Sequence, residues 1–289
     1  MRAHLQLIAV GAAFAVVATA AAAQAPAVTV TAKPPPASVN HAAYAFVQSI
    51  TVQPDGESLA RWNEPICPLV EGLTDEQDVA VATRIDQIAL AAGADVGGDG
   101  CAANFIVIAS REPGPLLAAW RRRDPLMFDG ASTSDADGFV SKARPVRVWY
   151  NVHRAPAGGQ AVTTDAGTFQ GIPSVHVATI SRLKRVTVRG IDSVILVVDT
   201  GQARDVTVEQ IADYVAVAGL AEIKPDADLD GVPTILRLFS ATSRPVGLTD
   251  WDRGFLAGLY RSDQASPLQR SAIAADVTAA ATQPRGAFR

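Results

Sequence analysis

The residues best suited to acid–base chemistry in this sequence are Asp213, Tyr214 and His176. A carboxylate and an imidazole held in one cleft can activate water for hydrolysis of a peptide or a glycan, and a phenol can donate a proton there. The sequence does not require such a cleft, because a carboxylate is also common in turns and caps, and a histidine within a strand is more often structural. Two functions therefore stay open: carboxylate-dependent hydrolysis and non-catalytic binding.

Nucleophilic catalysis has less support. The sequence contains no Gly-x-Ser-x-Gly motif, which positions the serine of α/β-hydrolases. Its two cysteines, Cys67 and Cys101, form an even pair that is expected to be a disulfide in an oxidising compartment. A disulfide leaves no thiol for catalysis, and two sulfurs alone are too few for a structural zinc site.

An acidic run, Asp226–Gly231, has the spacing that begins a calcium-binding loop. Asp226, Asp228 and Asp230 are therefore weak calcium candidates. The position where an EF-hand needs its bidentate glutamate is occupied by Arg237, a cation. The pattern favours an acidic surface turn over a calcium site, and we expect no cofactor.

The elements around these residues are typical of an α/β layer. Thr207 and Gln210 have capping-box spacing, which predicts a helix from there to Leu220, with Gly219 ending it in the left-handed conformation. The aliphatic run at 191–198 predicts a buried strand before that helix. Similar patterns predict a second capped helix from Thr74 to Gly93, ended by that glycine, and strands at 104–109, 146–152 and 175–180. We expect an α/β (α+β) fold with a mixed sheet and packed helices.

The N-terminus indicates export. Arg2, an apolar run and three alanines before Gln24 are typical of a signal peptide over residues 1–23. Residues 24–43, with three consecutive prolines, predict a disordered leader. A single globular domain is expected over 44–282, followed by a flexible tail at 283–289. The expected location is the periplasm or outside the cell, with no membrane span after signal cleavage.

The charge pattern limits the partners. The formal net charge is −4, and loss of Arg2 with the signal peptide makes the mature chain one unit more acidic. A mildly acidic chain lacks the basic surface that nucleic acid requires. We therefore expect an envelope protein or polymer as partner, of a kind that the sequence does not identify.

Three stretches carry a family resemblance: Leu248–Tyr260, Cys101–Ile108 and Arg121–Phe128. With them, residues 55–280 resemble an uncharacterised family of exported bacterial proteins that is itself similar to zincin metallopeptidases. The resemblance implies a zincin-like scaffold whose central helix would carry the zinc ligands.

Zincins place two histidines at i and i+4 on one helix face, with a glutamate next to the first. Aligning that pattern with Gly219 and Leu220 puts Ala212 and Ala216 at the histidine positions and Asp213 at the glutamate position. Alanine has no lone pair for a metal, so the resemblance implies a pseudoenzyme without zinc. The alternative is that both alanines are ordinary helix residues without such a history.

Overall fold

The structure is a computed structural model that describes residues 36–124, 133–157, 163–164, 173–174, 184–240 and 242–283. Its described helices are α1 Pro36–Ile50, α2 Asp75–Ala92, α3 Pro113–Arg123, α4 Thr133–Ser141, α5 Val208–Leu220, the 3-10 turn η2 Ile235–Arg237, α6 Asp250–Arg261 and α7 Gln269–Thr282. The described strands of the main sheet are β1 Arg61–Trp62, β2 Pro68–Glu71, β3 Phe105–Ser110, β4 Val146–Pro156 and β7 Thr187–Asp199. Two short strands, β5 Thr163–Thr164 and β6 Pro173–Ser174, pair separately.

Strand β7 is the centre of the sheet. Its residues Gly190–Ile191 pair in parallel with β1, and Val194–Asp199 pair in parallel with β3. Along its opposite edge it pairs antiparallel with β4 over the whole of that strand. Strand β2 extends the sheet beyond β3, also in parallel. The sheet is therefore mixed, which confirms the predicted α/β class.

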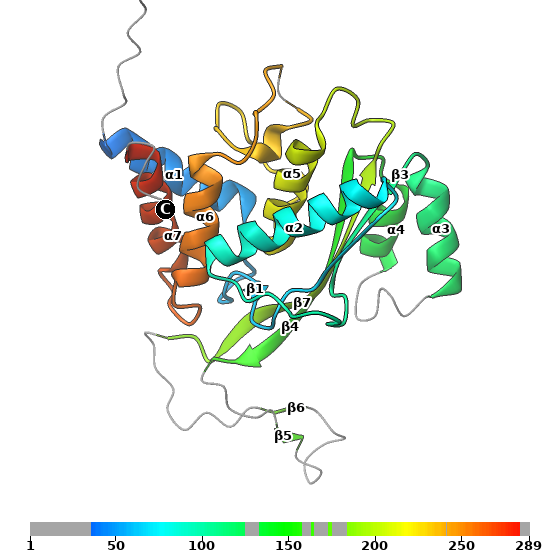
Figure 1. The fold of residues 1–289 in the computed structure, drawn as a ribbon. Helices are drawn as coiled ribbons and strands as arrows, with labels where there is room; N and C mark the ends of the chain where they lie inside the picture. Colours follow the sequence, from blue (N-terminus) through cyan, green and yellow to red (C-terminus); the bar gives the residue numbers. More distant parts are fainter. Residues whose placement is uncertain are drawn as a thin grey trace, which may run out of the picture. The chain divides into compact units, whose positions relative to one another are not determined.

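Both faces of β7 are covered, which explains its uninterrupted aliphatic sequence. Val194, Leu196 and Val198 point into the main core, beneath α2 and α5. Ile195 and Val197 point into a smaller cluster beneath α3 and α4. Figure 1 shows these two pairs of helices on opposite sides of the sheet.

The predicted starts of the two helices are confirmed. Thr207 and Gln210 form a complete capping box at the start of α5, and Thr74 forms one with Gln77 at the start of α2. Gly93 ends α2 with a φ of 92°, as predicted. These caps satisfy amide groups that would otherwise lack partners in the first helical turn.

The predicted role of Gly219 is wrong. Helix α5 continues through Gly219 to Leu220 and ends at Ala221 in extended backbone. Gly219 is needed for packing instead, because a Cβ there would lie 2.1 Å from Cζ of Phe105. Its carbonyl also accepts a hydrogen bond from Trp62 Nε1 at 2.8 Å. The close approach of helix and sheet, rather than the end of the helix, requires glycine.

The first helix begins earlier than the predicted domain. Helix α1 starts at Pro36, inside the stretch 24–43 expected to be a disordered leader. Val39 and Ala43 are already buried in it, and Phe46 packs edge-on against the Trp251 ring at a centroid distance of 5.4 Å. The proline run therefore leads directly into a packed helix, since proline is favourable in a first turn.

The predicted disulfide is confirmed between Cys67 and Cys101, whose Cα atoms are 6.0 Å apart. It joins the residue before β2 to the loop that leads to β3. A Cβ on Gly97 would lie 2.7 Å from Cys101 Sγ, so the loop needs glycine beside the sulfur. The glycine-rich sequence before Cys101 thus accommodates a cross-link.

Several predictions lie outside the described residues: the signal peptide, the strand at 175–180 and most of the tail after Gln283. In the part of the chain that the structure describes, no helix has the length and apolar character needed to cross a membrane.

Candidate functional site

Asp213 lies in the protein interior. Its side chain is 6 % exposed and accepts a hydrogen bond from Arg84 Nε at 2.7 Å. Its second oxygen accepts the backbone amide of Leu248 at 2.6 Å. Asp213 therefore joins α2 and α5 to the segment before α6.

Of the three predicted catalytic residues, the structure describes two, Asp213 and Tyr214, and these point to different sides of α5. Tyr214 lies half-buried on a different side of α5, where its ring packs edge-on against Phe239 at 5.2 Å between centroids. Burial raises the pKa of Tyr214 to about 12, which keeps the phenol protonated. His176 lies outside the described residues.

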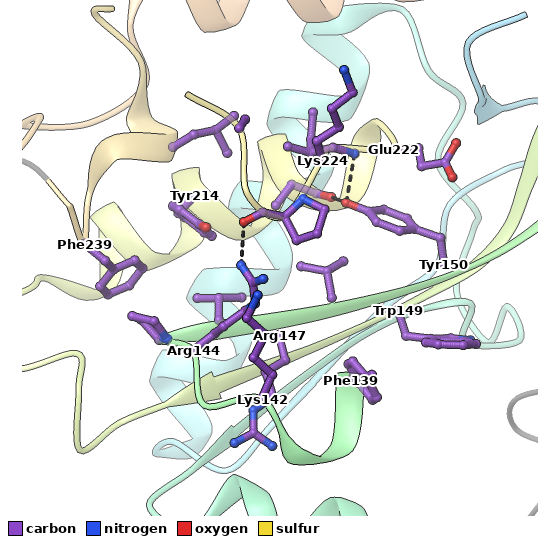
Figure 2. A pocket seen from close by; sticks show the side chains of 18 of the residues that line it. Phe139, Lys142, Arg144, Arg147, Trp149, Tyr150, Tyr214, Glu222, Lys224 and Phe239 are labelled. Carbon is purple, nitrogen blue, oxygen red and sulfur yellow. Dashed lines mark hydrogen bonds between the residues drawn. The ribbon is translucent and has the colours of Figure 1, made fainter. Parts of the chain in front are cut away.

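Tyr214 instead lines an open groove of about 810 Å³ beside strand β4. We call it the β4 groove. Its lining includes residues 144–150, Gly138 and Phe139 of α4, Tyr214 and Ala218 of α5, residues 222–225, Ala227 and Leu229, and Phe239 after η2. Figure 2 shows Tyr214, Phe239 and Tyr150 on one side of the strand and Phe139 on the other.

The groove follows the edge of β4 rather than one face of the sheet. Seven consecutive residues, 144–150, all line it. Successive side chains of a strand point to opposite faces, so only a groove that runs along the strand edge meets all of them. Val148 and Tyr150 point toward the main core, whereas Trp149 packs in the smaller cluster under α4.

The charged residues of the lining are mostly cations, although the whole chain is acidic. The described part of the lining contains one carboxylate, Glu222. It contains four cations: Lys142, Arg144, Arg147 and Lys224. The cations come from the turn before β4, from β4 and from the segment after α5. They make the groove attractive to an anion.

Hydrogen bonds hold both ends of the groove. At one end, the Tyr150 hydroxyl donates to the Ala218 carbonyl at 2.5 Å and accepts the Ile223 amide at 3.2 Å. At the other end, Arg144 donates to the Pro225 carbonyl at 2.5 Å. These contacts, which Figure 2 draws as dashed lines, fix the spacing between β4 and the segment that follows α5.

The one carboxylate of the lining, Glu222, is paired with a cation that does not belong to the lining. Glu222 forms an ion pair with Arg189, with Nη1 and Oε2 2.6 Å apart, and accepts a hydrogen bond from Nη2 at 3.0 Å. Burial raises the pKa of Glu222, and the Arg189 guanidinium acts in the opposite direction. Arg189 also pairs with Glu57 at 3.2 Å. Because Glu222 is matched by its own cation, the other cations of the groove are not cancelled by it.

Two of the three weak calcium candidates have partners within the chain. The Asp226 carboxylate accepts hydrogen bonds from Arg144 at 2.6 Å and from Lys142 at 3.3 Å, and these two cations lower its pKa. Asp228 accepts the backbone amide of Asp230 within the turn. No group of three or more histidine, cysteine or acidic side chains able to hold a metal occurs in the described ranges.

The two alanines aligned with zinc ligands lie in the core. Ala212 is 2 % exposed and Ala216 is 0 % exposed. Both belong to the main hydrophobic cluster, so this face of α5 packs against protein rather than lining the β4 groove. Descent from a zincin stays a prediction.

A pair that sequence analysis missed lies on the face of the sheet opposite the main core. His153 Nδ1 is 2.6 Å from Asp192 Oδ1, outside hydrogen-bond geometry, and both side chains are partly exposed. A β-bulge between Asn151 and Val152 shifts the register here, so that His153 lies opposite Gly190. A Cβ on that glycine would lie 2.5 Å from His153 Cε1. Pairing across strands was the missing signal, because the sequence shows only a lone histidine.

The Ser-x-x-Lys spacing of Ser181 and Lys184 is a second motif that sequence analysis missed. Ser181 lies outside the described residues. The side chain of Lys184 is 66 % exposed and forms an ion pair with Asp263 at 3.2 Å. A lysine that acts as a catalytic base is usually buried, and Lys184 is not.

Comparison of the chain with protein-family models, with curated proteins and with solved structures finds no match. Function must therefore be inferred from the geometry of the chain itself.

Proposed function

We propose that this protein is an exported, non-catalytic binding protein of the periplasm or cell exterior, and that its ligand occupies the β4 groove. The observation that carries the proposal is the groove itself, with its aromatic wall and its excess of cations on an acidic chain. Apolar walls with a few well-placed polar groups are typical of ligand sites. The ligand is therefore an anion that also carries apolar groups.

Export is supported by two features. The sequence begins with the charge and hydropathy pattern of a signal peptide. The Cys67–Cys101 disulfide fits an oxidising compartment. The zincin resemblance adds to this proposal only that Ala212 and Ala216 offer no zinc ligand, which favours binding over metal-dependent hydrolysis.

Anilinonaphthalene sulfonate, an anion with fused and single aromatic rings, is a suitable probe of the groove. We expect saturable fluorescence enhancement with the wild-type protein. The double variant Lys142→Glu, Lys224→Glu should bind about tenfold more weakly, because two attractive charges become repulsive.

The matched control is Arg122→Glu, a reversal of an exposed charge on α3 outside the groove. It should bind the probe as the wild type does. Equal affinity of the double variant and the control, with unchanged thermal unfolding, would show that the groove is not the binding site.

Carboxylate-dependent hydrolysis of peptides or glycans is the second candidate, and the His153–Asp192 pair is the observation in its favour. The two side chains lie 2.6 Å apart, and in this function a hydrogen bond between them would orient the ring as a base. If this function holds, the purified protein should cleave peptide or glycan substrates, and His153→Asn should abolish that cleavage. Activity that persists in the variant would exclude this pair as its source.

A further inference from the structure

The free edge of β4 is a second feature of the groove, and its meaning rests on the proposed binding function. Among the described residues, β4 pairs with β7 alone. The outer side of an edge strand presents unpaired backbone N–H and C=O groups that can bind another chain. We therefore ask which groups of β4 point into the groove.

One hydrogen bond shows which backbone groups of β4 point away from β7. The Asp199 amide donates to the Pro145 carbonyl at 2.8 Å, and these two residues continue the register that pairs Val146 with Val198. In an antiparallel pair, residues that exchange hydrogen bonds with the neighbouring strand alternate with residues whose backbone groups point away. Counting from Pro145, the odd-numbered residues up to 151 bond to β7. The backbone groups of Val146, Val148 and Tyr150 therefore point toward the groove.

These three residues lie in the part of β4 that lines the groove. The groove thus offers alternating donors and acceptors along its floor, with α4 beside one wall and α5 beside the other (Figure 2). A strand pairs with its neighbour at a spacing of about 4.8 Å, and its side chains alternate between the two sides. This arrangement matches recognition by strand addition, in which the main chain supplies affinity and the walls supply specificity.

The positive charges on β4 and at the rim of the groove indicate which kind of chain can bind there. Strand β4 contains Arg147, His153 and Arg154 but no acidic residue. Lys142 and Lys224 add exposed positive charge at the rim. A second copy of the chain pairing through β4 would place like charges together, which is unfavourable. An acidic segment is complementary, and its carboxylates can replace Asp226 as the partner of the rim cations.

We infer that the β4 groove binds an extended acidic segment of a partner protein, which adds to the sheet as a strand beside Val146–Tyr150. Apolar side chains of the segment contact the wall with Tyr214 and Phe239. Its carboxylates contact Lys142, Arg144 and Lys224. The ligand class is therefore an acidic peptide with apolar residues at alternate positions.

The substitution Val148→Pro tests the backbone contact. Proline removes the N–H that points into the groove without removing a hydrogen bond to β7, and proline is tolerated at such edge positions. The matched control is Val148→Ala, which shortens the same side chain but keeps the N–H. Both variants should unfold at temperatures close to that of the wild type, which thermal denaturation checks.

The probe is a displayed library of random peptides of about ten residues, selected on the wild-type protein. We expect the enriched peptides to be acidic and to bind Val148→Pro about tenfold more weakly than Val148→Ala, the effect of a lost backbone hydrogen bond with an unpaired partner. In a strand added to β4, the N–H groups of every second residue point toward β4. N-methylation of those residues in one enriched peptide should abolish binding, whereas N-methylation of the residues between them should not.

Failure of this inference is distinguishable from failure of the proposed function. Loss of anilinonaphthalene sulfonate binding in the rim-charge variant, together with no enriched peptide or with peptides insensitive to Val148→Pro, would leave the binding site in place and overturn strand addition. Selection of basic peptides would overturn the inferred preference for acidic segments. Concentration-dependent dimerisation that Val148→Pro abolishes, seen by sedimentation, would identify a second copy as the occupant and would also overturn the inference.

Discussion

Asp213 has both carboxylate oxygens occupied by partners from other parts of the chain. Arg84 comes from α2, and the Leu248 amide comes from the segment before α6. A carboxylate held in this way cannot approach a substrate without breaking contacts that stabilise the fold. These contacts support a structural role, and catalysis by Asp213 stays a prediction.

Replacement of Asp213 by alanine should lower the free energy of unfolding by about 2–4 kcal/mol, because a partly buried amide and a partly buried guanidinium lose their acceptor. Chemical denaturation measures the loss. Asp213→Asn keeps one acceptor oxygen and should lose less. A variant of wild-type stability that fails to bind the probe of the β4 groove would contradict the structural role.

The His153–Asp192 pair shows why a contact between two residues could not be predicted from the sequence. The two residues are far apart in the sequence, and a bulge in β7, where Asp192 is the extra residue, decides which residue lies opposite which. A shift of one position moves a side chain to the other face of the sheet. No local pattern in the sequence records that shift, so the pairing of these two residues was not predictable.

At the scale of elements, helices and strands with strong local signals were predictable. The capping boxes at Thr74 and Thr207 mark helix starts through contacts within four residues, and the aliphatic run of β7 marks a strand buried on both faces. The groove was not predictable, because it is formed by segments distant in sequence. The free edge of β4 depends on the order of strands in the sheet, which no single strand encodes.

Gly219 illustrates how packing between elements can override a local rule. Glycine near the end of a helical pattern predicts a left-handed cap. Here the Phe105 ring, fully buried on β3, occupies the space where a side chain would be. The contact between α5 and the sheet therefore explains a residue that the helix itself does not require.

Replacement of Gly219 by alanine should lower the free energy of unfolding by about 1–3 kcal/mol or more, as expected for overpacking of a filled core. The opposite would hold if the residue were an interior helix glycine in open space, where alanine stabilises. Gly98→Ala is the matched control, because a Cβ there would have no atom within 4 Å, and the change should leave stability nearly unchanged. Urea unfolding of both variants provides the comparison.

At the scale of the whole molecule, the disulfide joins the starts of two neighbouring parallel strands. Cys67 and Cys101 are 34 positions apart, so the bond closes a loop that contains β2 and α2. Closing such a loop restricts the unfolded chain more than the folded one. The cross-link therefore favours the pairing of β2 with β3 over the unfolded chain.

Replacement of both cysteines by alanine should lower the free energy of unfolding by about 4 kcal/mol. Denaturant titration measures this, and the wild-type protein titrated under reducing conditions should lose a similar amount. A loss smaller than about 1 kcal/mol would show that the bond does little to restrict the unfolded ensemble.

Strand β7 also limits how early the main sheet can form as the chain is synthesised. It is the shared neighbour of β1, β3 and β4, and it begins only at Thr187. A nascent chain that ends before this residue holds three strands without their common partner, so the sheet closes late and through contacts distant in sequence. If the chain is exported unfolded, as proposed, this late closure is an advantage, because the segment before Thr187 cannot complete the sheet until the rest of the chain has followed.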